Sequence, residues 1–318
     1  MSDIHLALMA GLAASNADAR ASDFPTQPIR IILPGSPGGT FDALAHLLAE
    51  GLQAQLKQPA IVETWPADAA FLAADLVARA KPDGHTILMG TAGLAMLPLL
   101  QKGLSYQPAH LRPLAISLLT PHVLVAGATK PELASLAELI AYGKANPGKL
   151  SAGSAETTGL FASLLFQSAS GIEALQVRHT GSTPLIAGVV AGHVDFALLG
   201  GASLMPPAQV DRLRLLAVTS DQRLPAIPDV PTLAELGVKS AAIEAWSGLM
   251  VPRGTDPAVV RVLERAIENV TTSQTYVKKA GEIGAIPCFI GSQAAAQFIA
   301  DDLKVKERLA AQAGIKPE

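Results

Sequence analysis

Short apolar runs alternate with longer segments of helical periodicity along this chain. Ile29–Leu33 is apolar, rich in Ile and too short for a buried helix, which is typical of a buried strand. Phe and Leu then recur at helical spacing between Phe41 and Leu52, which predicts a helix that begins near Thr40. The segment between them, Pro34–Gly39, is rich in Pro and Gly. A strand, a glycine loop and a helix N-terminus leave backbone N–H groups able to bind an anion, although a tight turn without a ligand is the alternative.

The same alternation continues directly downstream. Strands are expected at Ala60–Glu63 and Thr86–Gly90, with a helix at Ala69–Lys81 between them. Such alternation indicates an α/β domain with a mainly parallel sheet, whose ligands bind beyond the carboxyl ends of the strands. The small-residue loop Thr91–Gly93 follows a strand, so it is expected to line the same crevice as Pro34–Thr40.

A second set of strands and helices predicts a second α/β unit. The strands are expected at Leu114–Leu118, Val123–Ala126, Leu150–Ala152, Leu175–Arg178, Val194–Leu199 and Leu213–Thr219. The helices of this unit are expected at Leu133–Asn146, Leu160–Ser170 and Pro184–Ala191. After its return to the first unit, the chain is expected to end with helices at Pro257–Val270 and Gln293–Ala313. No linker rich in Gly, Ser or Pro separates the units, so we infer one crossing near residues 119–122 and a return near residue 245.

Composition narrows the function classes. The 318 residues are 49% hydrophobic and 4% aromatic, so the core must be mainly aliphatic. A net charge of −3 provides no basic field and argues against nucleic acid as a partner. The only cysteine, Cys288, can form neither an internal disulfide nor a thiolate metal cluster, and we expect it to be buried. G-x-S-x-G and H-E-x-x-H are absent, so we predict no enzyme, no catalytic residue, no metal and no cofactor.

The N-terminal segment has features of an export signal. Ile4–Ala14 is apolar and Ala19-Arg20-Ala21 resembles an A-x-A cleavage site, but no Lys or Arg precedes the apolar stretch. We interpret residues 1–23 as a truncated signal segment, with the mature chain beginning near Ser22. No apolar run reaches the length needed to span a bilayer.

Several ordered motifs resemble those of one family. Pro34–Asp42 resembles the P-x-S/P-P-G-G-x-x-D signature of Bug-type receptors, the periplasmic solute-binding proteins of tripartite tricarboxylate transporters. Further stretches resemble the family's other landmarks in the same order, and together they cover nearly all of residues 24–318. These stretches are Ala80–Thr86, Leu88–Gly93, Ser117–Leu119, Ala145–Leu150, Leu213–Ser220, Leu224–Thr232 and Val251–Thr255.

The resemblance implies the type II periplasmic-binding fold, with two α/β lobes joined by a hinge and a ligand cleft between them. Residues 24–120 and 246–318 would form the first lobe, and residues 121–245 the second. The expected function is capture of a small organic anion, of the carboxylate or dicarboxylate class, by a periplasmic monomer that delivers it to membrane transporter subunits. A sensory receptor that presents its ligand to a membrane signalling protein is the alternative.

The resemblance also implies ligand-binding positions on the strand-to-helix loops of both lobes. Asp42 has an equally good interpretation as a helix-start residue. His179 is otherwise a core or surface histidine, and Trp246 either packs under the hinge or stacks on a ligand. The positions are Ser36, Gly38, Gly39, Thr40, Asp42, Thr91, Ser154, Thr157, Thr158, His179, Thr180, Gly181 and Asp195.

Several positions in and near these loops depart from the family pattern, which predicts an atypical ligand or weakened affinity. Gly35 stands where an aromatic residue is common, His179-Thr180-Gly181 replaces Y-K-G, and Leu198-Leu199-Gly200 replaces F-D-N. Glu156 lies in a loop whose amides are expected to face a carboxylate. Glu156 could point to solvent, pair with Arg178, or meet a positive group on the ligand.

Overall fold

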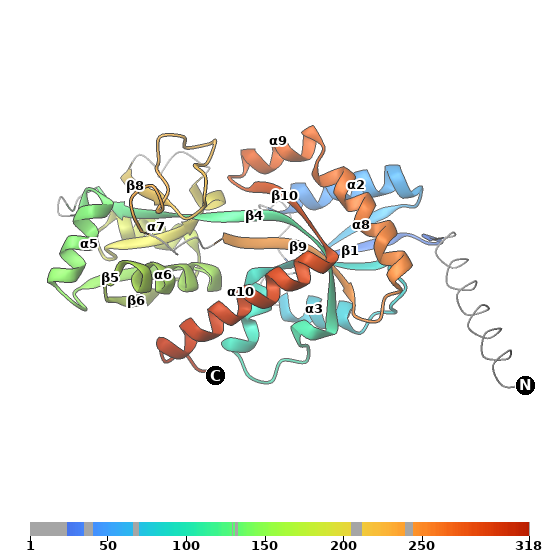
Figure 1. Cartoon of the computed structure of the whole chain (residues 1–318), viewed down its shortest axis with the longest axis horizontal. Coiled ribbons are helices and arrows are strands. Elements are labelled where there is room, and N and C mark those ends of the chain that lie inside the picture. The colour runs from blue at the N-terminus through green and yellow to red at the C-terminus, as the bar shows by residue number, and fades with distance from the viewer. Residues whose placement is uncertain are drawn as a thin grey trace, which may run out of the picture.

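The computed structural model describes residues 24–34, 41–65, 70–128, 130, 133–204, 212–238 and 244–317, so the expected signal segment lies outside the described residues. Within them, ten strands form one continuous sheet with the order β2-β1-β3-β9-β4-β7-β5-β6, and β8 and β10 both pair with β4. Figure 1 shows two halves of the molecule side by side, with β4 running from one into the other. The α/β fold class with two lobes is confirmed. None of the described helices combines the length and hydropathy needed to cross a membrane.

The first half of the sheet is built on an isoleucine-rich strand. Ile29, Ile31 and Ile32 of β1 have no exposed surface, whereas Arg30 is exposed and pairs with Glu63 of β2. A strand buried on both faces needs helices on both sides, and the two apolar clusters around β1 contain helices from opposite faces. The strands of this half are β1 (Ile29–Pro34), β2 (Ala60–Trp65), β3 (Thr86–Thr91), β9 (Glu244–Pro252) and β10 (Ile286–Gly291).

The helices of the first half form two layers. One layer packs against Ile29 and Ile31, and the other against Ile32. The first layer contains α2 (Asp42–Leu56), α8 (Pro257–Thr271) and α9 (Gln274–Glu282). The second contains α3 (Ala70–Ala78), α4 (Ala92–Met96) and α10 (Ser292–Gln312).

The second half repeats the arrangement on a smaller scale. Its parallel strands β5 (Leu150–Ser154), β6 (Ala174–Arg178) and β7 (Phe196–Gly200) are joined by β8 (Leu213–Val218), which pairs with β4. Its helices are α5 (Leu136–Ala145), α6 (Thr157–Ser170) and α7 (Ser182–Val190). Helices α5 and α6 cover one face and α7 the other.

The strand β4 (Leu111–Gly127) corrects the expectation of two separate strands at Leu114–Leu118 and Val123–Ala126. It is a single strand of 17 residues that changes neighbours halfway. Pairing with β9 ends at Pro121, and pairing with β7 begins at His122. Proline lacks the N–H that a strand interior needs, so it is tolerated here because the ladder changes partners at this residue.

The sheet is mixed rather than mainly parallel. The pairs β1–β2, β1–β3, β5–β6 and β5–β7 are parallel, as the alternation of strands and helices predicts. Every pair made by β4 or β9 is antiparallel. The two long strands run in opposite directions because one takes the chain out of the first half and the other brings it back.

Cys288 is less buried than the sequence led us to expect. It lies in β10, every residue of which is partly exposed, so its side chain is only partly covered. Its Sγ lies 3.8 Å from the carbonyl oxygen of Ile116 on β4, which is the contact expected of a weak thiol donor.

Candidate functional site

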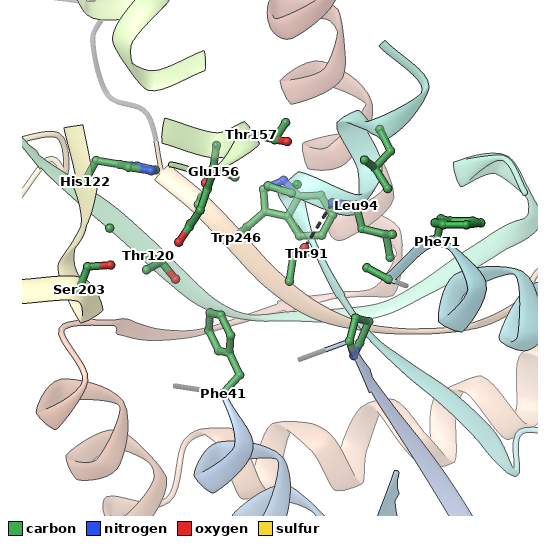
Figure 2. A pocket seen from close by; sticks show the side chains of 18 of the residues that line it. Phe41, Phe71, Thr91, Leu94, Thr120, His122, Glu156, Thr157, Ser203 and Trp246 are labelled. Carbon is green, nitrogen blue, oxygen red and sulfur yellow. Dashed lines mark hydrogen bonds between the residues drawn. The ribbon is translucent and has the colours of Figure 1, made fainter. Parts of the chain in front are cut away.

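A cavity of about 450 Å³ lies between the two halves of the sheet. Its wall combines the carboxyl ends of β1 and β3, the start of α6, and the middle of β4 (Figure 2). In α/β folds, ligands bind beyond the carboxyl ends of the parallel strands, so this cavity is the candidate site. The lining residues are Pro34, Phe41, Ala70, Phe71, Thr91, Ala92, Gly93, Leu94, Leu97, Gln101, Thr120, His122, Glu156, Thr157, Thr158, Gly200, Ser203, Ala245 and Trp246.

Thr91 forms the turn between β3 and α4. Its Oγ1 accepts a hydrogen bond from the backbone N–H of Leu94 at 3.3 Å, drawn as a dashed line in Figure 2. This is the usual use of threonine at a helix start, and it leaves the hydroxyl hydrogen available to donate. Thr91 thus stabilises its own turn and can still donate to an acceptor in the cavity.

Trp246 supports this wall from β9. Its side chain is 1% exposed, and its indole N–H donates to Oδ2 of Asp302 at 3.1 Å. Asp302 also forms an ion pair with Lys306 one turn along α10. A buried indole needs such a partner for its N–H. Trp246 is therefore both a core residue and part of the cavity wall, held in one orientation by α10.

The turn between β5 and α6 is built differently. Glu156 is the residue that starts α6, yet its side chain makes no capping hydrogen bond. The first intrahelical bond runs from the N–H of Leu160 to the carbonyl of Glu156 at 3.0 Å. The N–H groups at the start of any α-helix have no partner inside the helix. The amides around Thr157 and Thr158 therefore give this part of the wall a positive potential.

The carboxylate of Glu156 points from α6 toward the β4 side of the cavity (Figure 2). Ser182 donates to its Oε1 at 3.5 Å, and Ser203 donates to Ser182 at 3.0 Å. Burial among the cavity walls raises the pKa of the Glu156 carboxyl, and the Ser182 hydroxyl lowers it by less. Glu156 is nevertheless an exposed residue, so solvent screens its charge.

The proposed partner of Glu156 within its own lobe is not in place. Arg178 is exposed and does not line the cavity. Within the described ranges no ion pair joins it to Glu156. The hypothesis that Arg178 neutralises Glu156 is wrong for this conformation of the chain. The cause is geometric, because Arg178 ends β6 and lines a different depression together with the end of α10.

Two residues of β4 line the cavity and were not among the predicted site residues. The hydroxyl of Thr120 is buried and has no hydrogen-bond partner within the described part of the chain. His122 is 1% exposed, and its backbone N–H donates to Oγ1 of Thr219 at 2.9 Å. Their signal in the sequence was position alone, because both flank Pro121 in the expected crossing.

Three predicted residues lie in the wall: Thr91, Thr157 and Thr158. Ser36, Gly38, Gly39 and Thr40 lie outside the described residues, although their neighbours Pro34 and Phe41 line the cavity. The remaining predicted residues are not part of the described wall. These remaining residues are Asp42, Ser154, His179, Thr180, Gly181 and Asp195.

Asp195 has other partners. It forms an ion pair with Lys130 and accepts hydrogen bonds from both the N–H and the hydroxyl of Ser151, each at 2.7 Å. Burial raises the pKa of its carboxyl, but the bonds from Lys130 and Ser151 outweigh burial and hold the pKa below its usual range. Asp195 thus fastens the start of β5 to the start of β7.

Asp42 and His179, two further predicted residues, lie outside the described cavity wall and have structural contacts there. Asp42 opens α2, with its Oδ1 3.6 Å from Nε2 of His46. His179 follows β6, donates from its backbone N–H to the carbonyl of Ser154 at 2.8 Å, and lies with its ring against Gly188 of α7.

The charge of the wall is the most informative property of the site. Among the described lining residues, Glu156 and His122 are the only titratable ones, and neither Lys nor Arg is present. An anion in this cavity would be held by N–H groups and hydroxyls rather than by a salt bridge. This is the chemistry of a helix N-terminus.

Comparisons with known proteins agree on one family. The family described as "Tripartite tricarboxylate transporter family receptor" matches residues 44–315. Protein BugT of Bordetella pertussis is 32% identical over 305 residues, which cover 93% of this chain and 91% of that protein. The structure of Rpa4515 of R. palustris with adipate has a TM-score of 0.78 and 29% identity, covering 93% of this chain and 100% of its own. MatC of Rhodopseudomonas palustris with bound malate has a TM-score of 0.72 and 26% identity, covering 90% and 99%.

Proposed function

Because this chain belongs to the tripartite tricarboxylate transporter receptor family, we propose that it captures a small carboxylate in the cavity between its lobes. The observation that carries the proposal is the wall: N–H groups of α6 and hydroxyls of Thr91, Thr120, Thr157 and Thr158 surround one cavity. Adipate and malate are bound by the two similar proteins named above, which supports a carboxylate.

The lobes would close on the ligand about the two strands that join them. We propose residues 24–120 with 246–318 as one lobe and residues 121–245 as the other. Pro121 supports this division, because β4 changes neighbours there and proline has no N–H to donate to a neighbouring strand. Closure would bring Thr158 toward Gly93, which already lie close: a Cβ on Gly93 would be 3.8 Å from Cγ2 of Thr158.

Ligand binding can be tested directly on the purified chain. We expect mass spectrometry to detect a co-purifying carboxylate, and a panel of mono- and dicarboxylates to include one that raises the melting temperature. A ligand at a hundred times its Kd stabilises the folded state by about 2.7 kcal/mol. If no member of the panel stabilises the chain and nothing co-purifies, the proposal is wrong.

Two variants test whether the ligand binds in this cavity. Thr157→Val with Thr158→Val removes two hydroxyls from the wall and should weaken ligand binding about thirtyfold, at about 1 kcal/mol for each lost hydrogen bond. Thr183→Val is the control, because Thr183 is exposed on α7 and does not line the cavity. Equal ligand affinities of the two variants would show that the ligand binds outside this cavity.

We further propose that the chain works as a periplasmic monomer that delivers its ligand to the membrane subunits of a tripartite transporter. Membership of a receptor family supports this. Pull-downs with tagged, ligand-loaded chain should recover transporter membrane subunits. Recovery of a membrane signalling protein instead would favour the sensory alternative, and fractionation of cells would test the compartment.

A further inference from the structure

Glu156 is the one feature of the cavity that capture of a plain carboxylate does not explain. It is the only carboxylate among the described residues of the wall, and it stands at the start of α6, where an anion is expected to bind. Two unit charges about 5 Å apart in such a partly screened site repel enough to weaken binding roughly a hundredfold. Neither Lys nor Arg lines the described wall, where the buried His122 is the only titratable residue besides Glu156.

The conformation of Glu156 separates its charge from the amides that it precedes. A short polar side chain at the N-cap, such as Asp, Asn, Ser or Thr, normally accepts a hydrogen bond from the N–H groups of the first turn. Glu156 does not make that bond, and its carboxyl reaches Ser182 instead. The helix start therefore keeps its N–H groups for another acceptor, with a negative charge on the residue just before them.

A second, independent group points to a ligand. Thr120 is 9% exposed, lines the same cavity from β4, and its hydroxyl has no hydrogen-bond partner in the described part of the chain. Figure 2 shows Thr120 and Glu156 on the same side of the cavity. An unpaired buried hydroxyl is costly unless something occupies the site. A hydroxyl can accept from a cation as readily as it can donate to an anion.

We propose that the ligand is a 2-amino carboxylate, in which an ammonium group lies next to the carboxylate. The carboxylate accepts from the first amides of α6, and the ammonium donates to Glu156 and Thr120. The first amides of α6 and the Glu156 carboxyl border one cavity, and a 2-amino carboxylate carries a group complementary to each. This inference rests on the proposed carboxylate capture and specifies its substrate class.

Pairs of ligands that differ only in the amino group test the inference. Succinate and aspartate, glutarate and glutamate, and adipate and 2-aminoadipate form such pairs, and isothermal titration calorimetry gives each affinity. In the wild-type chain we expect the amino member of the best-binding pair to bind at least tenfold more tightly. This measurement needs no variant, so it holds even where a substitution disturbs folding.

Glu156→Gln then assigns the preference to one side chain. It should weaken the amino member at least tenfold and leave the plain member unchanged or tighter, while Glu173→Gln, which removes an exposed charge outside the cavity, changes neither. Tighter wild-type binding of the plain member, or a preference that survives Glu156→Gln, overturns the inference and leaves carboxylate capture standing. Failure of every pair to bind overturns both.

Discussion

Two strand-to-helix turns face each other across the cavity and use the residue that precedes the helix in opposite ways. At the end of β3, Thr91 bonds the N–H of Leu94 and stabilises its own short helix. At the end of β5, Glu156 leaves its helix without a side-chain cap. The comparison teaches that one backbone geometry supports two functions. A capped turn is a structural wall, and an uncapped turn keeps its amides for a ligand.

The largest expected effect comes from removing the support of the Thr91 turn. Trp246→Ala should lower the free energy of unfolding by about 3–5 kcal/mol, because it empties a fully buried site and leaves Asp302 without its indole partner. Urea denaturation followed by circular dichroism measures the loss. Trp65→Ala is the control, since Trp65 is only partly buried at the end of β2. A loss no larger than that of the control would mean that Trp246 does not hold this wall.

The strand β5, which leads into the Glu156 turn, is held at its start by Asp195 and its ion pair with Lys130, and this support should depend on pH. Asp195→Asn should cost about 2 kcal/mol at pH 7, because a charged hydrogen bond to Lys130 is lost. The pKa of Asp195 is lowered in the folded state, so its contribution is complete above the ordinary aspartate range and is lost as pH falls through the folded pKa. Denaturation at pH 7 and in acid should therefore show the two chains converge in acid. The exposed Asp221→Asn serves as the control, and a difference that is constant with pH would contradict the ionic explanation.

Removing the N-cap side chain from each turn tests the difference between the two turns most directly. Thr91→Ala should lower the free energy of unfolding by about 1 kcal/mol, because the bond to Leu94 is lost. Glu156→Ala should have almost no effect on the unliganded chain, because no capping bond exists to lose. Thr91→Ser, which keeps the oxygen, is the control for the first substitution. Equal losses of unfolding free energy at Thr91 and Glu156 would contradict the view that only the Thr91 turn is capped.

The smallest expected effect concerns the titration of Glu156. Burial raises the pKa of this carboxyl in the folded state. Its stabilising contribution is therefore full below the unfolded pKa and is lost as pH rises through the folded pKa. Relative to wild type, Glu156→Gln should be slightly more stable at neutral pH, and the difference should vanish in acid. Melting temperatures across this range measure it, with Glu173→Gln as the flat control.

The parts of the fold that could be predicted are those in which neighbouring residues decide the structure. β1 and α2 were predicted from the isoleucine run and the leucine spacing, and the structure has them at Ile29–Pro34 and Asp42–Leu56. α9 and β10 were not predicted. Pro287 argues against a strand, and β10 exists only because it pairs with β4 across an irregular register.

The candidate site divides in the same way. Thr91, Thr157 and Thr158 were predicted from the family resemblance, and they line the cavity because each lies in a turn between a strand and a helix. Thr120, His122 and Ser203 line the cavity because of how β4 crosses and how β7 pairs with it, and no local pattern carries that information. The structural role of Asp195 likewise depends on Lys130 and Ser151, which are distant in sequence.

The order of strands also has a consequence for the time course of folding. β3 cannot complete its pairing until β9 is made, and β4 needs both β9 and β10. Both β9 and β10 are synthesised after the entire second half of the sheet. Until then, the edge of β3 presents unpaired backbone groups, which are a template for association with other chains. The half of the sheet that is made first is therefore the half that is completed last, and its long-range pairing should set the overall folding rate.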